Sequence, residues 1–574
     1  MAEVLLSPGV LSIENDQSQV TQGPVTVGAA IIGPTVKGPV EIPTLVTSYS
    51  DYVNKFGTTF VSGSDVYSYF TSITAYNYFN NGGESLLVSR IVSGAYSSAT
   101  SSFVSGSTAG SIASGSIFVL ETLSKGTIMN NVDSTGTIST GSLGNGTADN
   151  VRWEIVSPDT ASGTFGLLIR QGNDTPNSKI VLETWTNLSL DPKQPNFISK
   201  VIGDYTLNYN STNNQIEISG SYPNASRYVR IKSVIPTPDY LDNNGAPKAE
   251  YTPFIPVAKN GVFGSATGNM EATGGNKYFD KISNTNSQGL VAANYDNMVR
   301  LLSNQDDYRF NVLLTPGLVN DFSNHSSTIS SIITNTQGRG DSLFVLDLVG
   351  YGSSVTTVSG QASTRDTSYA ASYWPWCQIQ DPSSGKNVWV PASVLIAGVY
   401  AYNDRVAEPW FAPAGINRGG LGTVIRAEQK LSQSQRDTLY QTKVNPIATF
   451  PGTGTVVYGN KTLQTKASAL DRVNVRRLLI SLKGYVGQVA NTLVFEQNTT
   501  ATRNQFLAQV NPYLESIQQR QGLYSFRVVM DESNNTPDVI DRNQLVGAIY
   551  LQPTKTAEFI YLNFNITPTG ASFA

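Results

Sequence analysis

The chain has 574 residues, well beyond the roughly 250–300 residues that one hydrophobic core usually serves, so several domains are expected. Its 38 basic and 42 acidic residues give a formal net charge of −4, which leaves no basic surplus for a phosphate backbone and argues against nucleic-acid binding as the main task. One cysteine, Cys377, and one histidine, His325, exclude an internal disulfide and a zinc site of cysteine and histidine ligands.

The N-terminal residues predict neither export nor stable membrane insertion. Glu3 stands where a signal peptide would be basic, and Pro8 interrupts the apolar run. The longest apolar stretch, residues 394–402, falls far short of the ~20 residues that a membrane-spanning helix needs. We therefore expect a soluble chain that folds without disulfides in a reducing compartment.

Residues 1–22 are typical of an N-terminal arm. Val10, Leu11 and Ile13 form a short strand pattern between Pro8 and a polar run, with no hairpin partner nearby. The following block, 23–95, carries Gly-Pro pairs around β-branched runs and then an aromatic, helix-like stretch.

The composition changes sharply after residue 95. Serine, threonine, glycine, alanine and asparagine dominate to about residue 150, and short β-prone fragments continue to about 235. Small polar residues suit turns and solvent but build no large core. Residues 96–235 are therefore predicted to be an inserted, surface-exposed all-β domain, with a disordered linker over 96–116 as the alternative.

Helix and strand patterns alternate between about 285 and 405. Buried strands are predicted over residues 310–314 and 342–348. Apolar side chains at helical spacing predict two helices, the second closed by Gly338: Tyr295, Met298, Val299 and Leu302 in the first, Ile329, Ile332 and Ile333 in the second. Together with 23–95, residues 236–405 are predicted to form a discontinuous central α/β domain with a partly parallel sheet.

The last 170 residues predict an α+β block. One amphipathic helix covers 475–493, and another covers 506–517, bent at Pro512 and stopped before Gly522. Residues 406–552 are assigned to this α+β core domain. Residues 553–574 form a C-terminal arm strand in which alternate side chains share one face: Ile560, Leu562, Phe564 and Ile566.

The predicted fold class is thus α/β and α+β multidomain. It combines a C-terminal α+β core domain completed by terminal β-strand arms, a central α/β domain and an inserted all-β domain. The terminal strands have no local partner, and open strands are hazardous unless something pairs with them. They could add to the chain's own C-terminal sheet or complete a sheet in a neighbouring copy, and composition does not decide between these.

No motif predicts catalytic, cofactor-binding or metal-binding residues, so we expect no enzyme and no cofactor. Residues 454–462 fail as a phosphate loop because Asn460 separates the glycine from Lys461, and their interior is strand-like. The glycine-rich run 415–422 fails the dinucleotide spacing. His325 is predicted to be a solvated residue at a helix start, and residues 339–341, Arg-Gly-Asp, to be a helix-to-strand turn.

An ordered series of short motifs resembles the tail sheath proteins of contractile-tailed bacteriophages and their contractile-injection relatives. The resemblance is specific over about 390–574, moderate near 1–95 and weak in the insertion, and Lys461 stands where many relatives have arginine. The motifs are Ser7-Pro8-Gly9-Val10, Val390-Pro391-Ala392-Ser393, Ala397-Gly398-Val399-Tyr400-Ala401 with Asp404, Trp410-Phe411-Ala412-Pro413-Ala414-Gly415, Val444-Asn445-Pro446-Ile447, Phe450-Pro451-Gly452, Tyr458-Gly459, Thr462-Leu463, Asn474-Val475-Arg476-Arg477, Phe495-Glu496, Asn535-Thr536-Pro537 and Pro553-Thr554-Lys555-Thr556-Ala557-Glu558-Phe559-Ile560.

The resemblance implies a homo-oligomer of helically stacked sheath rings around an inner tail tube, with baseplate and tail terminator proteins as further partners. The sheath would be assembled in the host cytoplasm, belong to the virion, and contract from a metastable extended state. The core domain would lie near the tube and the insertion would face outward. The inter-subunit arm strands would be carried by Val10, Leu11, Ile13, Ile560, Leu562, Phe564 and Ile566.

Two functions of other classes remain open. A β-rich virion decoration or adhesin protein would explain the Ser/Thr/Gly-rich insertion and the low charge content. A hydrolase acting on a surface polymer is disfavoured, because no acid/base pair or nucleophile is apparent in the sequence.

Overall fold

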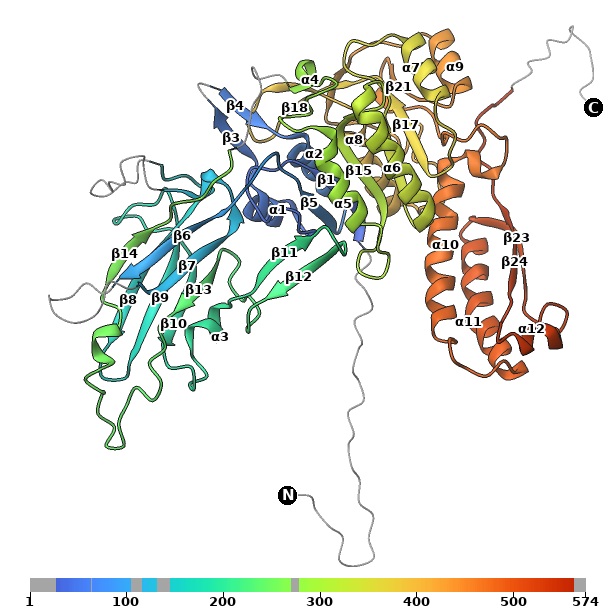
Figure 1. Cartoon of the computed structure of the whole chain (residues 1–574). Coiled ribbons are helices and arrows are strands. Elements are labelled where there is room, and N and C mark those ends of the chain that lie inside the picture. The colour runs from blue at the N-terminus through green and yellow to red at the C-terminus, as the bar shows by residue number, and fades with distance from the viewer. Residues whose placement is uncertain (1–26, 63–64, 105–115, 132–144, 270–277, 562–574) are drawn as a thin grey trace, which may run out of the picture.

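The computed structural model describes residues 27–62, 65–104, 116–131, 145–269 and 278–561 (Figure 1). The chain forms a mixed α/β, multidomain structure. A central sheet with helices on both faces lies between an all-β region and a C-terminal region that contains two long helices (Figure 1).

The central sheet has eight strands, and its five inner pairings are parallel. Only the outermost pairs, β2 with β5 and β21 with β22, are antiparallel. The predicted α/β layer with partly parallel pairing is confirmed. In sheet order the strands are β2 (Thr44–Val46), β5 (Leu86–Arg90), β1 (Val27–Gly33), β15 (Phe310–Val319), β16 (Leu343–Asp347), β17 (Ala370–Trp374), β21 (Asn445–Phe450) and β22 (Gly454–Val457).

Both faces of this sheet are buried, which explains why its strands are continuously apolar rather than alternating. Along β1, Ala29 and Ile31 point into one core, and Ala30 and Ile32 into the other. The first core contains helices α1 (Tyr49–Phe56), α2 (Phe70–Asn80) and α8 (Ser393–Val406). The second contains α5 (Asp296–Leu301), α6 (Ser323–Arg339), α7 (Val355–Ser363) and α9 (Gln433–Gln441).

Two predicted boundaries in this region were wrong. Strand β15 continues through Pro316 to Val319 instead of ending at residue 314. Helix α6 passes Gly338 and ends at Arg339, because the left-handed cap conformation is adopted by Gly340, with φ of 69°. The helices and strands themselves are confirmed.

The all-β region encloses its own core between two sheets. Aromatic side chains fill that core, among them Trp153, Phe118 and Phe165. One sheet runs β13 (Val229–Val234), β7 (Ser116–Lys125), β6 (Ser98–Val104). The other runs β10 (Val181–Ser189), β9 (Thr164–Gln171), β8 (Val151–Asp159), β14 (Lys259–Val262), so it includes a strand beyond residue 235.

Smaller elements complete these two regions. The hairpin of β11 (Thr206–Asn210) and β12 (Gln215–Ser219) packs Tyr209 and Ile216 against the second central core, which ties the all-β region to the central sheet. The others are β3 (Thr59–Ser62), β4 (Asp65–Ser68), α3 (Ile198–Ile202), α4 (Tyr278–Lys281), β18 (Cys377–Gln380), β19 (Asn387–Val390) and β20 (Val424–Ala427).

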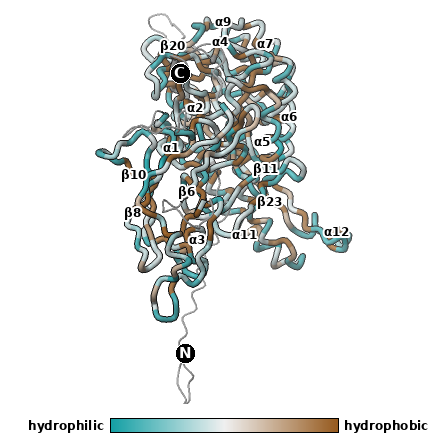
Figure 2. Tube along the Cα trace, turned by 60° about the vertical axis from the view of Figure 1, so that its left-hand side comes forward, coloured by the Kyte–Doolittle hydropathy of each residue, from teal (hydrophilic) through white to brown (hydrophobic). Residues whose placement is uncertain are grey.

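The C-terminal region begins with α10 (Val473–Asn491) and α11 (Thr500–Gln519), and both predicted helices are confirmed. Helix α11 continues through Pro512. Strand β23 (Leu523–Val529), the short helix α12 (Pro537–Asp541) and β24 (Ala548–Pro553) follow. The segment around α12 is largely hydrophilic and projects from the body (Figure 2). Strands β21 and β22 belong to the central sheet, so this sheet reaches past residue 405, the predicted domain boundary.

Candidate assembly interface

The C-terminal region contains an unfinished sheet. Strands β23 and β24 pair antiparallel, from Leu523 opposite Pro553 to Val529 opposite Ala548. Within the described residues no third strand pairs with either outer edge. A two-stranded sheet is only marginally stable by itself, and its free N–H and C=O groups are a template for another strand.

The two faces of this sheet differ. Phe526, Val528, Ile549 and Leu551 are partly buried against the core formed with α10 and α11. On the opposite face Tyr524 is 63% exposed and Tyr550 is 62% exposed, and Arg527, cross-strand to Tyr550, is exposed as well. The β23–β24 sheet therefore presents both free edges and an aromatic face to other molecules.

After β24 the chain leaves the sheet as an extended segment that forms no strand in its described part, residues 554–561. Phe559, Ile560 and Tyr561 follow one another and are 69%, 76% and 87% exposed. Of the predicted arm residues only Ile560 is described, and it contacts no core. Val10, Leu11, Ile13, Leu562, Phe564 and Ile566 lie outside the described residues.

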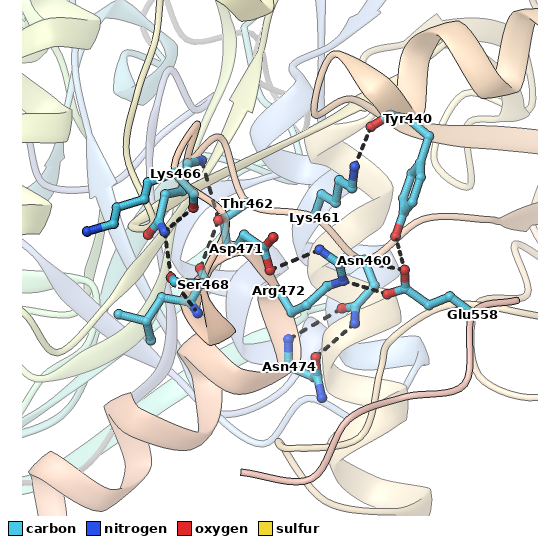
Figure 3. A network of polar contacts seen from close by, with 12 residues as sticks. Tyr440, Asn460, Lys461, Thr462, Lys466, Ser468, Asp471, Arg472, Asn474 and Glu558 are labelled. Carbon is cyan, nitrogen blue, oxygen red and sulfur yellow. Dashed lines mark hydrogen bonds and ion pairs between the residues drawn. The ribbon is translucent and has the colours of Figure 1, made fainter. Parts of the chain in front are cut away.

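Glu558 holds this segment to the body immediately before the exposed apolar run (Figure 3). The Nε of Arg472 donates to Glu558 Oε1 at 2.6 Å, and its Nη2 donates to Oε2 at 3.0 Å. The hydroxyl of Tyr440 donates to the same Oε2 at 2.7 Å. Asp471 contacts Nη1 of Arg472 at 2.9 Å. We call Glu558, Arg472 and Tyr440 the arm clasp.

Local backbone pairing positions the clasp. Arg472 precedes α10 and pairs with Lys461 in an isolated antiparallel bridge. The ammonium of Lys461 donates to the Tyr440 carbonyl at 2.8 Å and lies 4.2 Å from the centroid of the Tyr440 ring. The near-miss phosphate loop thus has a structural role, in which its lysine fixes Tyr440 at the end of α9.

The pKa shifts in the clasp keep the Tyr440 phenol protonated and the Arg472 guanidinium positively charged, as their hydrogen bonds to Glu558 require. Burial raises the pKa of the Tyr440 phenol, and the Glu558 carboxylate raises it further, so the phenol remains a donor. Burial lowers the pKa of Arg472, but the hydrogen bond to Glu558 and the surrounding negative charges outweigh it, and the net shift is upward. The ion pair is partly buried, with side-chain exposures of 26% for Arg472 and 17% for Glu558.

Sequence reasoning missed the clasp. Its members are separated by 86 and 118 residues, so no local spacing connects them. The sequence offered one indication, a single charged residue, Glu558, directly before an alternating apolar strand pattern. The sequence pattern does not indicate which basic side chain pairs with Glu558, because the fold brings Arg472 to it.

The prediction for His325 was wrong in one respect. His325 does lie at the start of α6, but it is fully buried, and its Nδ1 accepts a hydrogen bond from the Val319 N–H at 3.1 Å. Burial lowers its pKa from 6.5 to about 4. The neighbouring serines and asparagines suggested solvent, whereas helical spacing puts His325 on the inward face with Ile329 and Ile332.

The other sequence candidates are structural. Arg339 is almost fully buried, donates to both carboxylate oxygens of Asp341 and stacks 4.3 Å from the Phe310 ring centroid, so residues 339–341 form the predicted turn. Among the described residues there is no group of three or more His, Cys, Asp or Glu that could hold a metal ion. In the same part of the chain no helix is long and apolar enough to cross a membrane.

Two known protein-family domains match this chain, and the boundary between them lies shortly before α10. Residues 291–463 match the phage tail sheath protein central domain, and residues 465–567 match the phage tail sheath C-terminal domain. The tail sheath protein of Vibrio phage KVP40 is 42% identical over 248 residues, which are 42% of this chain and 36% of that protein. The tail sheath protein of Enterobacteria phage T4 is 43% identical over 193 residues, 34% of this chain and 29% of that protein.

The chain thus spans about a third of the length of these curated relatives. Among solved structures, the sheath tail protein of Listeria innocua superimposes with a TM-score of 0.54 at 10% identity, over 92% of this chain and 95% of that one. That likeness concerns the fold alone.

Proposed function

We propose that this chain, whose residues 291–463 and 465–567 match phage tail sheath domains, is a structural, non-enzymatic subunit of a contractile tail sheath. Copies would polymerise into a helical cylinder of stacked rings around an inner tail tube. Contraction of that cylinder would drive the tube through the host envelope.

The unfinished β23–β24 sheet is the observation that carries this proposal. A sheet with two free edges and one bare face accepts strands from outside, and strand addition needs only main-chain hydrogen bonds and alternate side-chain pockets. The C-terminal segment leaves the same region with three exposed apolar side chains in a row, Phe559 to Tyr561. One copy therefore has both a strand to donate and an edge to receive one.

We assign the donated strands to the predicted arms. Val10, Leu11 and Ile13 of the N-terminal arm, and Ile560, Leu562, Phe564 and Ile566 of the C-terminal arm, would enter the sheets of neighbouring copies. An interface in which one copy donates and the next receives is heterologous, so it generates an open helix when the rotation does not close. Arms of this kind let copies rotate and slide during contraction without separating.

The predicted architecture and surroundings are part of the proposal. The core domain, 406–552, would face the tube, and the insertion, 96–235, would face outward. The inner tube, baseplate and tail terminator proteins would be the partners, in a virion assembled in the bacterial cytoplasm.

Truncation tests the arm assignment. Deleting residues 1–20, or residues 562–574 so that the arm clasp stays intact, should leave a folded monomer that no longer polymerises. Electron microscopy should show striated hollow tubes for the full chain and single particles for both deletions, with matching circular dichroism spectra. Tubes of normal length from either deletion would refute the arm assignment, and a full chain that forms only isolated particles would favour a decoration protein.

A further inference from the structure

The C-terminal segment is attached to the body at very few points. Thr554 donates from its backbone to Gly522 and from its hydroxyl to Gln521, beside the start of β23. Between Lys555 and Tyr561, every hydrogen bond and ion pair of the described chain involves Glu558. The direction in which the segment leaves is therefore set by one carboxylate.

The clasp also joins the two parts of the chain that match separate sheath domains. Tyr440 and Lys461 lie in the central-domain match, whereas Arg472 and Glu558 lie in the C-terminal match. A force applied to the segment beyond Glu558 would thus be transmitted through the clasp to α9 and the start of α10 before it acted on β24. Three charge-assisted hydrogen bonds on one carboxylate make a firmer attachment than an exposed ion pair.

We propose that Glu558 is a positioning residue of the C-terminal arm, which fixes the point from which the arm reaches a neighbouring copy. This inference rests on the proposed sheath function. With the clasp closed, the arm starts at Phe559 from a fixed place on the body. With it open, residues 555–558 join the arm and add roughly 13 Å of reach at ~3.3 Å per extended residue. The clasp sets the spacing at which copies connect.

The first test measures the arm in the unassembled, full-length chain. Spin labels at Tyr561→Cys and at Gln441→Cys, an exposed position at the end of α9, report the distance across the clasp, with Cys377→Ser in every variant. Glu558→Gln should broaden the distance distribution and lengthen its mean by up to roughly 13 Å. Tyr440→Phe, which removes one hydrogen bond and no charge, should broaden it less.

Glu532→Gln is the matched control, because Glu532 is exposed and makes no ion pair in the described structure. It should leave the distribution unchanged, and all variants should keep the melting temperature of the doubly labelled Cys377→Ser parent to within ~2 °C. A Glu558→Gln distribution as narrow as that of the wild type would overturn the proposal. If Glu558→Gln proved unfolded, the Tyr440→Phe distribution would decide in its place.

The second test uses assembled sheaths, and it separates this proposal from the proposed function. Glu558→Gln should still form tubes, because the arm strand is intact, but the axial spacing of their rings should scatter more widely in electron micrographs. Wider distances in the monomer combined with wild-type ring spacing would refute the positioning role while leaving the sheath function standing. Failure of the wild-type chain to form tubes would instead contradict the sheath function.

Discussion

The central sheet and the β23–β24 sheet differ in how their faces and edges are covered. The central sheet buries both faces under helices, and one of its two edge strands, β22, is bridged through Val456 to Gly420. The β23–β24 sheet covers one face and leaves two edges and an aromatic face open. The first is a finished core that holds the subunit together. Under the proposed function, strands from other copies would complete the second sheet, so folding and assembly would depend on different parts of the chain.

The sharpest way to test this comparison is to make the same substitution in the central sheet and in the segment that follows β24. Phe344 on β16 is fully buried in the second central core, so Phe344→Ala should lower the free energy of unfolding by about 3–5 kcal/mol. Phe559→Ala removes the same ring from a side chain that is 69% exposed and should change it by less than ~0.5 kcal/mol. Denaturant unfolding of the two monomers measures both values, and equal losses would contradict the division.

Phe559→Ala should nevertheless affect assembly. If its ring enters a neighbouring copy, the concentration at which tubes appear should rise several-fold, while Phe344→Ala protein that remains folded should assemble normally. Sedimentation of tubes across a protein dilution series measures this threshold.

A second prediction concerns pH and the finished core. Since burial lowers the pKa of His325 from 6.5 to about 4, neutral histidine stabilises the native state fully above pH 6.5. This contribution is lost as the pH falls from 6.5 towards 4, and it amounts to about 3 kcal/mol by 1.36 kcal/mol per pKa unit. His325→Asn keeps an acceptor for the Val319 N–H but cannot titrate.

The check is the free energy of unfolding measured at pH 7.5 and at pH 4.5. The wild type should lose more stability than His325→Asn over this interval, and the difference between the two losses is the quantity of interest. Parallel losses would show that His325 is not the titrating group. Because the β23–β24 sheet lies away from α6, the same change of pH should alter its local hydrogen exchange equally in the wild type and in His325→Asn.

The two regions also differ in how far the sequence predicts them. Continuous apolar runs such as 343–346, and helix faces such as Ile329 with Ile332, indicate the central α/β layer directly, because both faces of a parallel sheet are buried. The helices α10 and α11 are predicted equally well, from the helical spacing of their apolar residues. The solvated environment expected for His325 failed because composition describes a neighbourhood, whereas burial depends on which helix face a residue occupies.

The clasp could not be predicted at all from local patterns. Glu558, Arg472 and Tyr440 are brought together by the path of the chain between β24 and α9, and no periodicity encodes that path. The arm pattern was visible as alternating apolar residues, but the point at which the arm leaves the body was not. Local sequence predicts elements, and long-range contacts decide where they are attached.

The prediction that sharpens the comparison most concerns the exposed aromatic face of the β23–β24 sheet. Replacing Tyr524 and Tyr550 together by serine removes two aromatic rings that are mostly exposed, so the free energy of unfolding should fall by less than ~1 kcal/mol. The concentration needed for tube formation should rise at least tenfold if a neighbouring copy covers this face. Gln552→Ser, an exposed change on the same sheet without loss of a ring, is the control and should assemble like the wild type. An unchanged threshold for the double variant would mean that incoming strands use only the edges, and the aromatic face would then have no part in assembly.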